Sequence, residues 1–364
     1  MSASEGVDPR LVAVEDGPRL PGPPPVIARG DRAALVEERL TLVRAATAAA
    51  GAAGALLDRR RDVTWLTLGA ELHVVQGADE VAAPILVTPD GAWVVAPNNE
   101  AARIEAEEIV GLPLAMDVVP WHEEAGIAAA VGRRAPRGAL LAGTDLESAL
   151  APLRPRLSPP EHERMRWLAR AARAALDGST AVMLPGRTEA DVVSVLVGSL
   201  GAAGVRAPVV LAGADERMRF RHPLPSAAPL RDRLMLVLVA ERWGLHVAAT
   251  RMAWLGGDGA MHPADAQASR VLAAVAGASR PGATLGEVFA AAEAAYEREG
   301  LPGEWQQHHQ GGTIGYAPRE RIATPGDPTP LEAGMAVAWN PSVPGGKAEA
   351  TLLVTDGEPE AILA

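Results

Sequence analysis

The first half of the chain alternates between a helical and a strand period in its hydrophobic and polar residues. From Arg32 to Ala50 apolar residues recur at roughly helical spacing, which predicts a helix, and the segment 100–110 has the same character. Runs rich in β-branched and aromatic residues predict strands. These cover residues 54–58 and 63–68, a hairpin over 84–97 that turns at Pro89-Asp90-Gly91, and residues 116–122. Strands alternating with helices indicate an α/β unit over residues 32–153.

The second half begins after a proline-rich segment, 154–160, which favours an extended linker because proline cannot join the interior of a sheet. Helical patterns follow at 161–178, 188–204, 263–279 and 284–299, with strand patterns between them. We therefore predict an α+β protein. Its expected parts are a Pro/Gly-rich tail (1–31), an N-terminal unit (32–153) and a C-terminal unit (158–364).

Composition narrows the class of protein. A net charge of −11 argues against a nucleic-acid backbone or an anionic membrane as partner, because both attract basic surfaces. The absence of cysteine excludes disulfides, iron–sulfur clusters, thiolate zinc sites and a cysteine nucleophile. No apolar run is long enough to cross a bilayer, and the acidic, polar N-terminus lacks the apolar core of a signal peptide. We therefore expect a cytoplasmic protein.

Three segments near the C-terminus carry the most informative pattern. They are LVLVAERWGLHVAATRMAWLGG (236–257), HHQGGTIGYAPRE (308–320) and AVAWNPSVPGGKAEATLLVTDG (336–357). With GRTEADV (186–192) and RFRHPLP (219–225) they resemble the pita-bread family (peptidase M24), in its aminopeptidase P, prolidase and creatinase branch. The resemblance implies a creatinase-like α/β domain followed by a pita-bread domain. It also implies a homodimer in which Arg60, Arg61 and Trp65 approach the neighbouring pocket, although an exposed basic turn beside a core tryptophan explains them as well.

The resemblance also shows which family residues are missing. Family members that use metal hold two ions with two Asp, one His and two Glu, since paired divalent ions need several anionic oxygens. The matching positions here are degenerate: Val237 (or Leu238 or Val239), Ala248, Gly312 and Asn340. The last Glu alone is kept, as Glu349. One carboxylate cannot hold two metal ions, so we expect neither a metal nor another cofactor.

His222, Glu349 and His308 are the candidate catalytic residues. His222 matches the general base and acid of the metal-free creatinase type, and imidazole can accept and return a proton near neutral pH. The resemblance places Glu349 deep in the pocket, where it would steer a cationic substrate, and places His308 on the cavity wall. Both residues also have a structural alternative. His222 could simply be kept where the chain enters a strand, and Glu349 could form a salt bridge with Arg251.

Several further residues are candidates for substrate binding. They are His246, His309, Asn340, Thr250, Arg251 and Trp305. His246 lies two residues before Ala248, so both should point into the cavity, whereas His309 should point elsewhere if its segment is extended. For the same reason Trp339 should point away while Asn340 points in. Trp305 could form a wall for a planar substrate, but core packing is the commoner role of such a residue.

Three functions fit this pattern. The first is a metal-independent hydrolase or lyase of the creatinase type, acting on a C–N bond of a small polar substrate. The second is a non-catalytic binding module. The third is an Xaa-Pro-type aminopeptidase with a displaced metal site, including an imidazole-rich site for Zn or Fe. That site would be built from His222, His246, His308 and Glu349.

Overall fold

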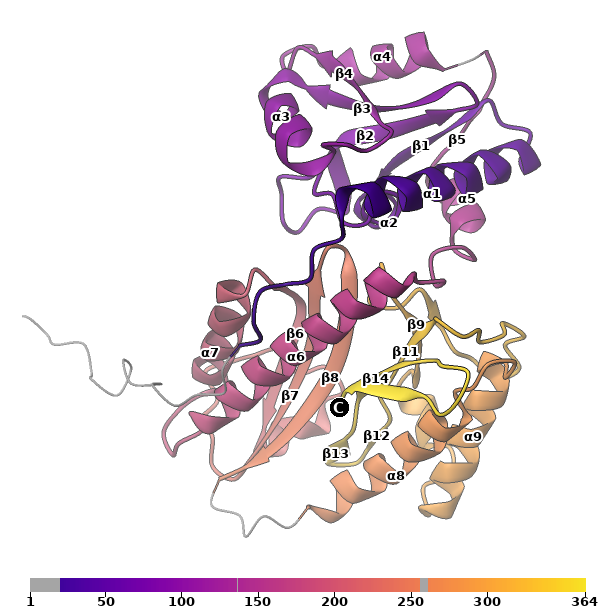
Figure 1. Ribbon diagram of the computed structural model, residues 1–364. Helices are drawn as coiled ribbons and strands as arrows, with labels where there is room; N and C mark the ends of the chain where they lie inside the picture. The colour runs from indigo at the N-terminus through magenta and orange to yellow at the C-terminus, as the bar shows by residue number, and fades with distance from the viewer. Residues whose placement is uncertain (1–19, 136, 256–260) are drawn as a thin grey trace, which may run out of the picture.

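The computed structural model describes residues 20–135, 137–255 and 261–364, which form two lobes (Figure 1). The N-terminal lobe has a mixed five-stranded sheet in the order β4-β3-β2-β1-β5. Its strands are β1 (Gly54–Arg59), β2 (Glu80–Thr88), β3 (Gly91–Pro97), β4 (Ala115–Val119) and β5 (Leu140–Leu141). Its helices are α1 (Arg29–Ala49), α2 (Arg60–Thr67), α3 (Asn98–Arg103), α4 (Gly126–Arg134) and α5 (Gly143–Leu150), and a π-helical turn (Ile104–Glu108) follows α3. The predicted hairpin over 84–97 is confirmed as β2 and β3, paired antiparallel.

One predicted strand is wrong. Residues 63–68 lie in α2 and its C-cap, although their β-branched and aromatic composition favours a strand. The hydroxyl of Thr67 donates to the carbonyl of Val63 at 2.7 Å, a bond that is compatible with a helix. Leu68 then ends the helix in the left-handed conformation, with φ 53°. Burial of Trp65 and its neighbours against the rest of the lobe overrides the local preference.

The C-terminal lobe begins with two helices that cover a long three-stranded antiparallel sheet, β6-β7-β8 (Figure 1). The helices are α6 (Pro159–Ala181) and α7 (Glu189–Ala202), and the strands are β6 (Arg206–Ala214), β7 (Arg233–Arg242) and β8 (Leu245–Trp254). Helix α6 continues past Gly178, where the sequence pattern predicts its end. The 3₁₀ turn η3 (Asp215–Arg219) begins the connection from β6 to β7.

A second sheet, in the order β10-β9-β11-β14-β15, completes this lobe. Its strands are β9 (Gly311–Ile314), β10 (Arg321–Ile322), β11 (Ala336–Trp339), β14 (Ala350–Leu353) and β15 (Glu360–Leu363). The remaining elements are α8 (Pro263–Ala278), α9 (Leu285–Arg298), η4 (Glu304–Gln307) and the short pair β12 (Ser342–Val343) and β13 (Gly346–Lys347). Helices α8 and α9 pack on this sheet through an apolar cluster that includes Trp339.

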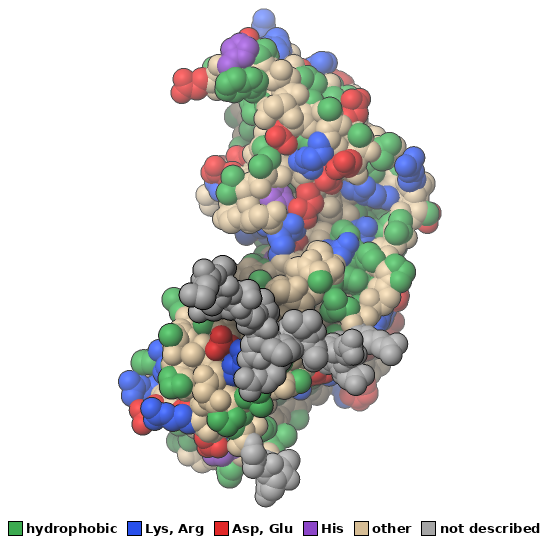
Figure 2. All heavy atoms as spheres, turned by 90° about the vertical axis from the view of Figure 1, so that its left-hand side faces the viewer, with side chains coloured by type: hydrophobic (Ala, Val, Ile, Leu, Met, Phe, Trp, Pro, Cys, Tyr) green, Lys and Arg blue, Asp and Glu red, His purple; other side chains and the backbone are tan. Residues whose placement is uncertain are grey.

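The segment before α1 only partly matches the predicted tail. Residues 1–19 lie outside the described part of the chain, and residues 20–28 run along the C-terminal lobe, where the indole N–H of Trp167 donates to the carbonyl of Gly22 at 2.7 Å. Helix α1 begins at Arg29, so the last residues assigned to the tail are helical. Figure 2 shows the two lobes from the side, with acidic and basic side chains interspersed on this face.

The two lobes are joined by buried ion pairs. Arg154, which is fully buried, contacts Asp62 and Glu320 at 2.9 Å and Glu147 at 2.6 Å. Arg60 pairs with Glu241 at 2.6 Å. Arg61 in turn pairs with Glu147 at 2.5 Å, and Trp65 is part of the core. Arg60 and Arg61 thus have partners within their own chain, and the homodimer stays a prediction.

Candidate functional site

A pocket of about 320 Å³ opens where the two sheets of the C-terminal lobe meet the loop that precedes β7. Strands β6 and β7 supply one wall, and the loops around β9, β11 and β13 supply the other. The residues that line it are Val209, Leu211, His222, Val237, Val239, His309, Pro318, Arg319, Asn340, Lys347 and Glu349. One wall is therefore aliphatic, and the opposite wall is polar and charged.

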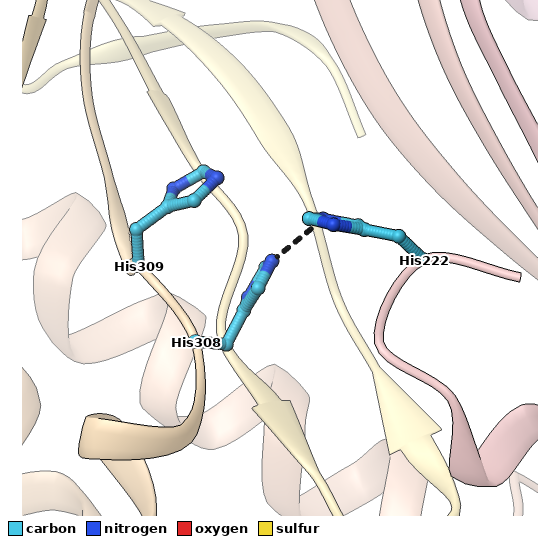
Figure 3. A group of neighbouring side chains, drawn as sticks. All are labelled: His222, His308 and His309. Carbon is cyan, nitrogen blue, oxygen red and sulfur yellow. Dashed lines mark hydrogen bonds between the residues drawn. The ribbon is translucent and has the colours of Figure 1, made fainter.

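Three histidines form a cluster (Figure 3), of which His222 and His309 line the pocket, whereas His308 is not part of the lining. The Nε2 atoms of His222 and His308 lie 3.0 Å apart and form a hydrogen bond. The ring of His309 lies 4.6 Å from that of His308, between centroids. One nitrogen from each of the three rings lies within 4.8 Å of the others. His222 reaches the cluster because its loop folds over β6, where the carbonyl of Pro223 accepts a hydrogen bond from the Ala212 N–H at 3.0 Å.

The expected direction of His309 is wrong. Alternation along an extended segment predicts that it points away from the cavity, whereas it lines the pocket. The prediction assigned the cavity to the wrong histidine of the pair, because His309 lines the pocket and His308 does not. The two rings nevertheless lie 4.6 Å apart between centroids, where the chain leaves the 3₁₀ turn η4.

The three imidazoles are neutral at pH 7. Burial, with the charge of Lys347 next in size, lowers the pKa of His308 to about 2. Burial and the charge of Arg319 lower the pKa of His309 to about 4. Burial also lowers the pKa of His222, which is the most exposed of the three. Each ring therefore offers one donor and one acceptor nitrogen.

Glu349 is the acid of the pocket, and it is already held by protein groups. The Thr250 hydroxyl donates to one of its carboxylate oxygens at 2.8 Å, and Arg319 donates to the other at 3.1 Å. The carboxylate is nearly completely buried. Arg319, and not the expected Arg251, is thus its cationic partner. Thr250 positions Glu349 from the adjacent strand.

Lys347 and Arg319 are the pocket residues that the sequence analysis missed. Lys347 is 4% exposed, and burial lowers its pKa. A signal was available, since Lys347 is the single lysine of a chain that otherwise uses arginine for its permanent cations. The residues next to Arg319 in the sequence did not predict that its side chain lines the pocket. It follows from the turn after β9, which places Pro318 and Arg319 at the pocket.

The degenerate positions are brought close together by the two sheets. Val237, Val239 and Asn340 line the pocket beside Glu349, and Ala248 pairs with Val239 across the β7–β8 hairpin. Gly312 lies in β9 with φ +154°, where a Cβ would be 1.9 Å from the carbonyl oxygen of Arg321. With one carboxylate left, and that one bound to Arg319, these residues do not fit a two-metal centre.

Two candidate binding residues, His246 and Arg251, lie elsewhere. His246 does not enter the pocket. It lies between the lobes, beside Glu241, and its Nδ1 is 3.0 Å from the carbonyl oxygen of Gly315. Arg251 faces α6 and pairs with Asp177 at 2.6 Å, because it alternates with Thr250 along β8. The predicted metal site of His222, His246, His308 and Glu349 is therefore wrong, because His246 lies away from the other three residues.

Two tryptophan predictions concern the same region. Trp339 is fully buried, and its indole N–H donates to Ser279 at 2.8 Å. Asn340 lines the pocket. The prediction that Trp339 points away from the cavity while Asn340 points into it is therefore confirmed. Trp305 does not line the pocket. Its ring packs edge-on against Phe289 at 5.3 Å between centroids, so it belongs to the core of the lobe.

Comparison with known proteins identifies the family. The model of metallopeptidase family M24 matches residues 163–356. The chain belongs to metallopeptidase family M24. A curated relative of this M24 protein is a probable dipeptidase PepE of Mycobacterium tuberculosis, 28% identical over 331 residues, which covers 84% of this chain and 87% of the relative.

Solved structures show the same fold over nearly the whole M24 protein. Dipeptidase PepE from Mycobacterium ulcerans has a TM-score of 0.70 at 22% identity and covers 91% of this chain and 96% of its own. The prolidase from Pyrococcus horikoshii OT3 has a TM-score of 0.72 at 16% identity and covers 90% and 98%. The predicted pita-bread fold is therefore confirmed. Family membership supports a hydrolase, and no helix among the described residues is long and apolar enough to span a membrane.

Proposed function

We propose that this M24 protein hydrolyses a C–N bond in a small polar substrate without the two-metal centre of its family, with His222 as the proton-transfer group. The observation that carries the proposal is the hydrogen bond between His222 and His308, whose Nε2 atoms are 3.0 Å apart at the mouth of the pocket. Family membership supports hydrolysis. Because the positions matched to metal ligands lack metal-binding side chains, we assign the proton transfer to the imidazoles of the pocket.

The hydrogen bond between the two rings requires that one Nε2 atom donates and the other accepts. If His222 donates from Nε2, its Nδ1 keeps a lone pair that can take a proton from a water molecule. The water oxygen then bonds to the amide or amidine carbon, and the C–N bond breaks as His222 returns the proton to the leaving nitrogen. His308 then keeps its own proton on Nδ1, which is buried without a hydrogen-bond partner among the described residues, so its proposed role is to orient His222 through the bond between the two rings.

The test is the His222→Ala variant, assayed for amine release from a panel of dipeptides, small amides and cyclic amidines. We expect turnover to fall by about 10²–10⁴-fold, the usual contribution of general acid–base catalysis. The His122→Ala variant, which changes an exposed histidine of the N-terminal lobe, should retain wild-type turnover. Retained turnover in the His222→Ala variant contradicts the assignment, and a panel without any turnover favours the binding module.

A second candidate is a hydrolase that binds a single metal ion. It is supported by the clustering of His222, His308 and His309, since three imidazoles with an open position suit zinc. The charges of Lys347 and Arg319 beside the cluster oppose it. Metal analysis of untagged protein, purified without chelator, separates the two: less than about a tenth of an equivalent supports the metal-free enzyme, and nearly one equivalent supports this alternative.

A further inference from the structure

The charge of the pocket is opposite to what a metal centre requires. Lys347 and Arg319 are its cations and Glu349 is its acid. The imidazoles that line it are neutral at pH 7, as their lowered pKa values indicate. With the Lys347 amine protonated, the lining carries one net positive charge, which favours a ligand with one negative charge.

Lys347 is the cation that lacks a partner. Its side chain is 4% exposed, and no carboxylate of the described residues lies within salt-bridge distance of its ammonium group. Glu349, two residues along the chain, is bound to Arg319 and Thr250. A buried charge without a partner is costly, and an anion that enters the pocket would remove this cost.

The remaining residues of the pocket lining indicate which chemical groups the rest of the ligand would carry. Val237 and Val239 of β7, with Val209 and Leu211 of β6, form the aliphatic wall of the pocket that Lys347 also lines. The side-chain oxygen of Asn340 is buried without a hydrogen-bond partner among the described residues. A pocket of about 320 Å³ with one cationic end and one aliphatic wall suits a small amphiphilic molecule.

We propose that Lys347 binds the carboxylate of a small organic monoanion whose apolar part packs on the wall formed by Val237 and Val239. The pocket that holds cations in metal-dependent family members thus holds an anion in this chain. A carboxylate matches the single net charge, whereas a phosphate dianion exceeds it. That this anion is the substrate rests on the proposed function, but its binding does not, because binding needs no turnover.

The first experiment compares three ligands on the full-length protein by ligand-observed NMR titration: 4-methylpentanoate, its neutral amide, and inorganic phosphate. We expect the carboxylate to bind at least about tenfold more tightly than the amide or phosphate, since the amide lacks the charge that Lys347 pairs with. Equal binding of carboxylate and amide overturns the proposal. Tighter binding of phosphate overturns the assignment to a monoanion.

Variants identify the cation responsible. Lys347→Met should weaken carboxylate binding by about tenfold or more and leave amide binding unchanged. The control Arg280→Gln removes an equal charge from an exposed pair with Glu358 and should bind like the wild type. Unchanged carboxylate binding by Lys347→Met contradicts the proposal. Carboxylate binding that depends on Lys347, in a wild-type protein that turns over no compound of the panel, contradicts the proposed function alone.

A measurement on the unaltered protein covers the case in which Lys347→Met does not fold. Lys347 is the only lysine, so an acylating reagent has one side-chain amine to modify, and the terminal amine serves as internal reference. Mass spectrometry should show that 4-methylpentanoate slows acylation of Lys347 relative to the terminal amine, and that its amide does not. Equal rates with both ligands contradict the proposal.

Discussion

At the scale of single residues, Gly312 shows why the position that the resemblance matches to a metal-binding histidine does not accept a side chain in this backbone. Its φ of +154° favours glycine, and the carbonyl oxygen of Arg321 occupies the space that a Cβ needs. The family histidine that matches this position therefore requires a different local backbone. The close pairing of β9 with β10, in which Gly312 lies opposite Ile322, leaves no space for a histidine side chain at this position.

We expect Gly312→Ala to lower the free energy of unfolding by about 3 kcal/mol, because it combines backbone strain with a steric clash. The matched control is Gly198→Ala in the exposed part of α7, where a Cβ meets nothing within 4 Å. That change should stabilise the protein by roughly 0.5–1 kcal/mol. Urea unfolding of both variants checks the pair, and equal effects would show that β9 tolerates side chains at this position.

At the scale of elements, the β7–β8 hairpin joins the pocket to the N-terminal lobe. Its turn residues Trp243 and Gly244 both have positive φ, and Glu241 accepts a hydrogen bond from the Gly244 N–H at 2.8 Å. Glu241 also accepts from Arg60 at 2.6 Å and from Arg206 at 2.5 Å. The same hairpin carries Val237 and Val239 to the pocket, so the ion pairs of Glu241 fix the position of one pocket wall.

Burial opposes ionisation of Glu241, but the hydrogen bond and charge of Arg206, with the other cations nearby, lower its pKa from 4.5 to about 2. A carboxyl whose folded pKa is depressed stabilises the protein above its unfolded pKa, and this stability is lost as the pH falls from 4.5 to about 2. Glu241→Gln should therefore cost about 3 kcal/mol at pH 7 and flatten acid unfolding in this window.

The control for Glu241 is Glu358→Gln, which removes a charge from a side chain that is 74% exposed. Its unfolding curves at pH 7 and pH 3 should match those of the wild type, because exposed ion pairs contribute little. Denaturant unfolding of both variants across this pH range is the measurement. An acid transition of the Glu241→Gln variant that matches the wild type would contradict the role given to Glu241.

At the scale of the whole molecule, Arg154 is the charged contact shared most widely between the lobes. It lies just before α6 and binds Asp62 of α2, Glu147 of α5 and Glu320 of the loop between β9 and β10. Asp62 and Glu320 are almost completely buried, so neither has water as an alternative partner. Arg154 is therefore one of several buried cations that hold the two lobes in their orientation, together with Arg39, which pairs with Glu161 at 2.6 Å, and Arg60.

Arg154→Met should destabilise the protein by about 3–5 kcal/mol, since it leaves buried carboxylates without a cation. Scanning calorimetry should show a lower midpoint and separate transitions for the two lobes. Arg156→Met is the matched control, because Arg156 is 55% exposed and pairs with Glu332 at the surface. Its cost should stay below about 1 kcal/mol. A single transition near the wild-type midpoint in Arg154→Met would show that the remaining contacts, such as the Arg60–Glu241 pair, hold the lobes together without Arg154.

The amino-acid sequence was enough to predict the fold family and most helices and strands, because these depend on ordered motifs and on residue types. It did not determine α2, since burial of Trp65 outweighs local strand preference. Tertiary structure alone decided which polar groups share the pocket. It brought in Lys347, Arg319 and His309, and it separated His246 and Arg251 from them. These contacts join segments far apart in the chain, where local periodicity carries no information.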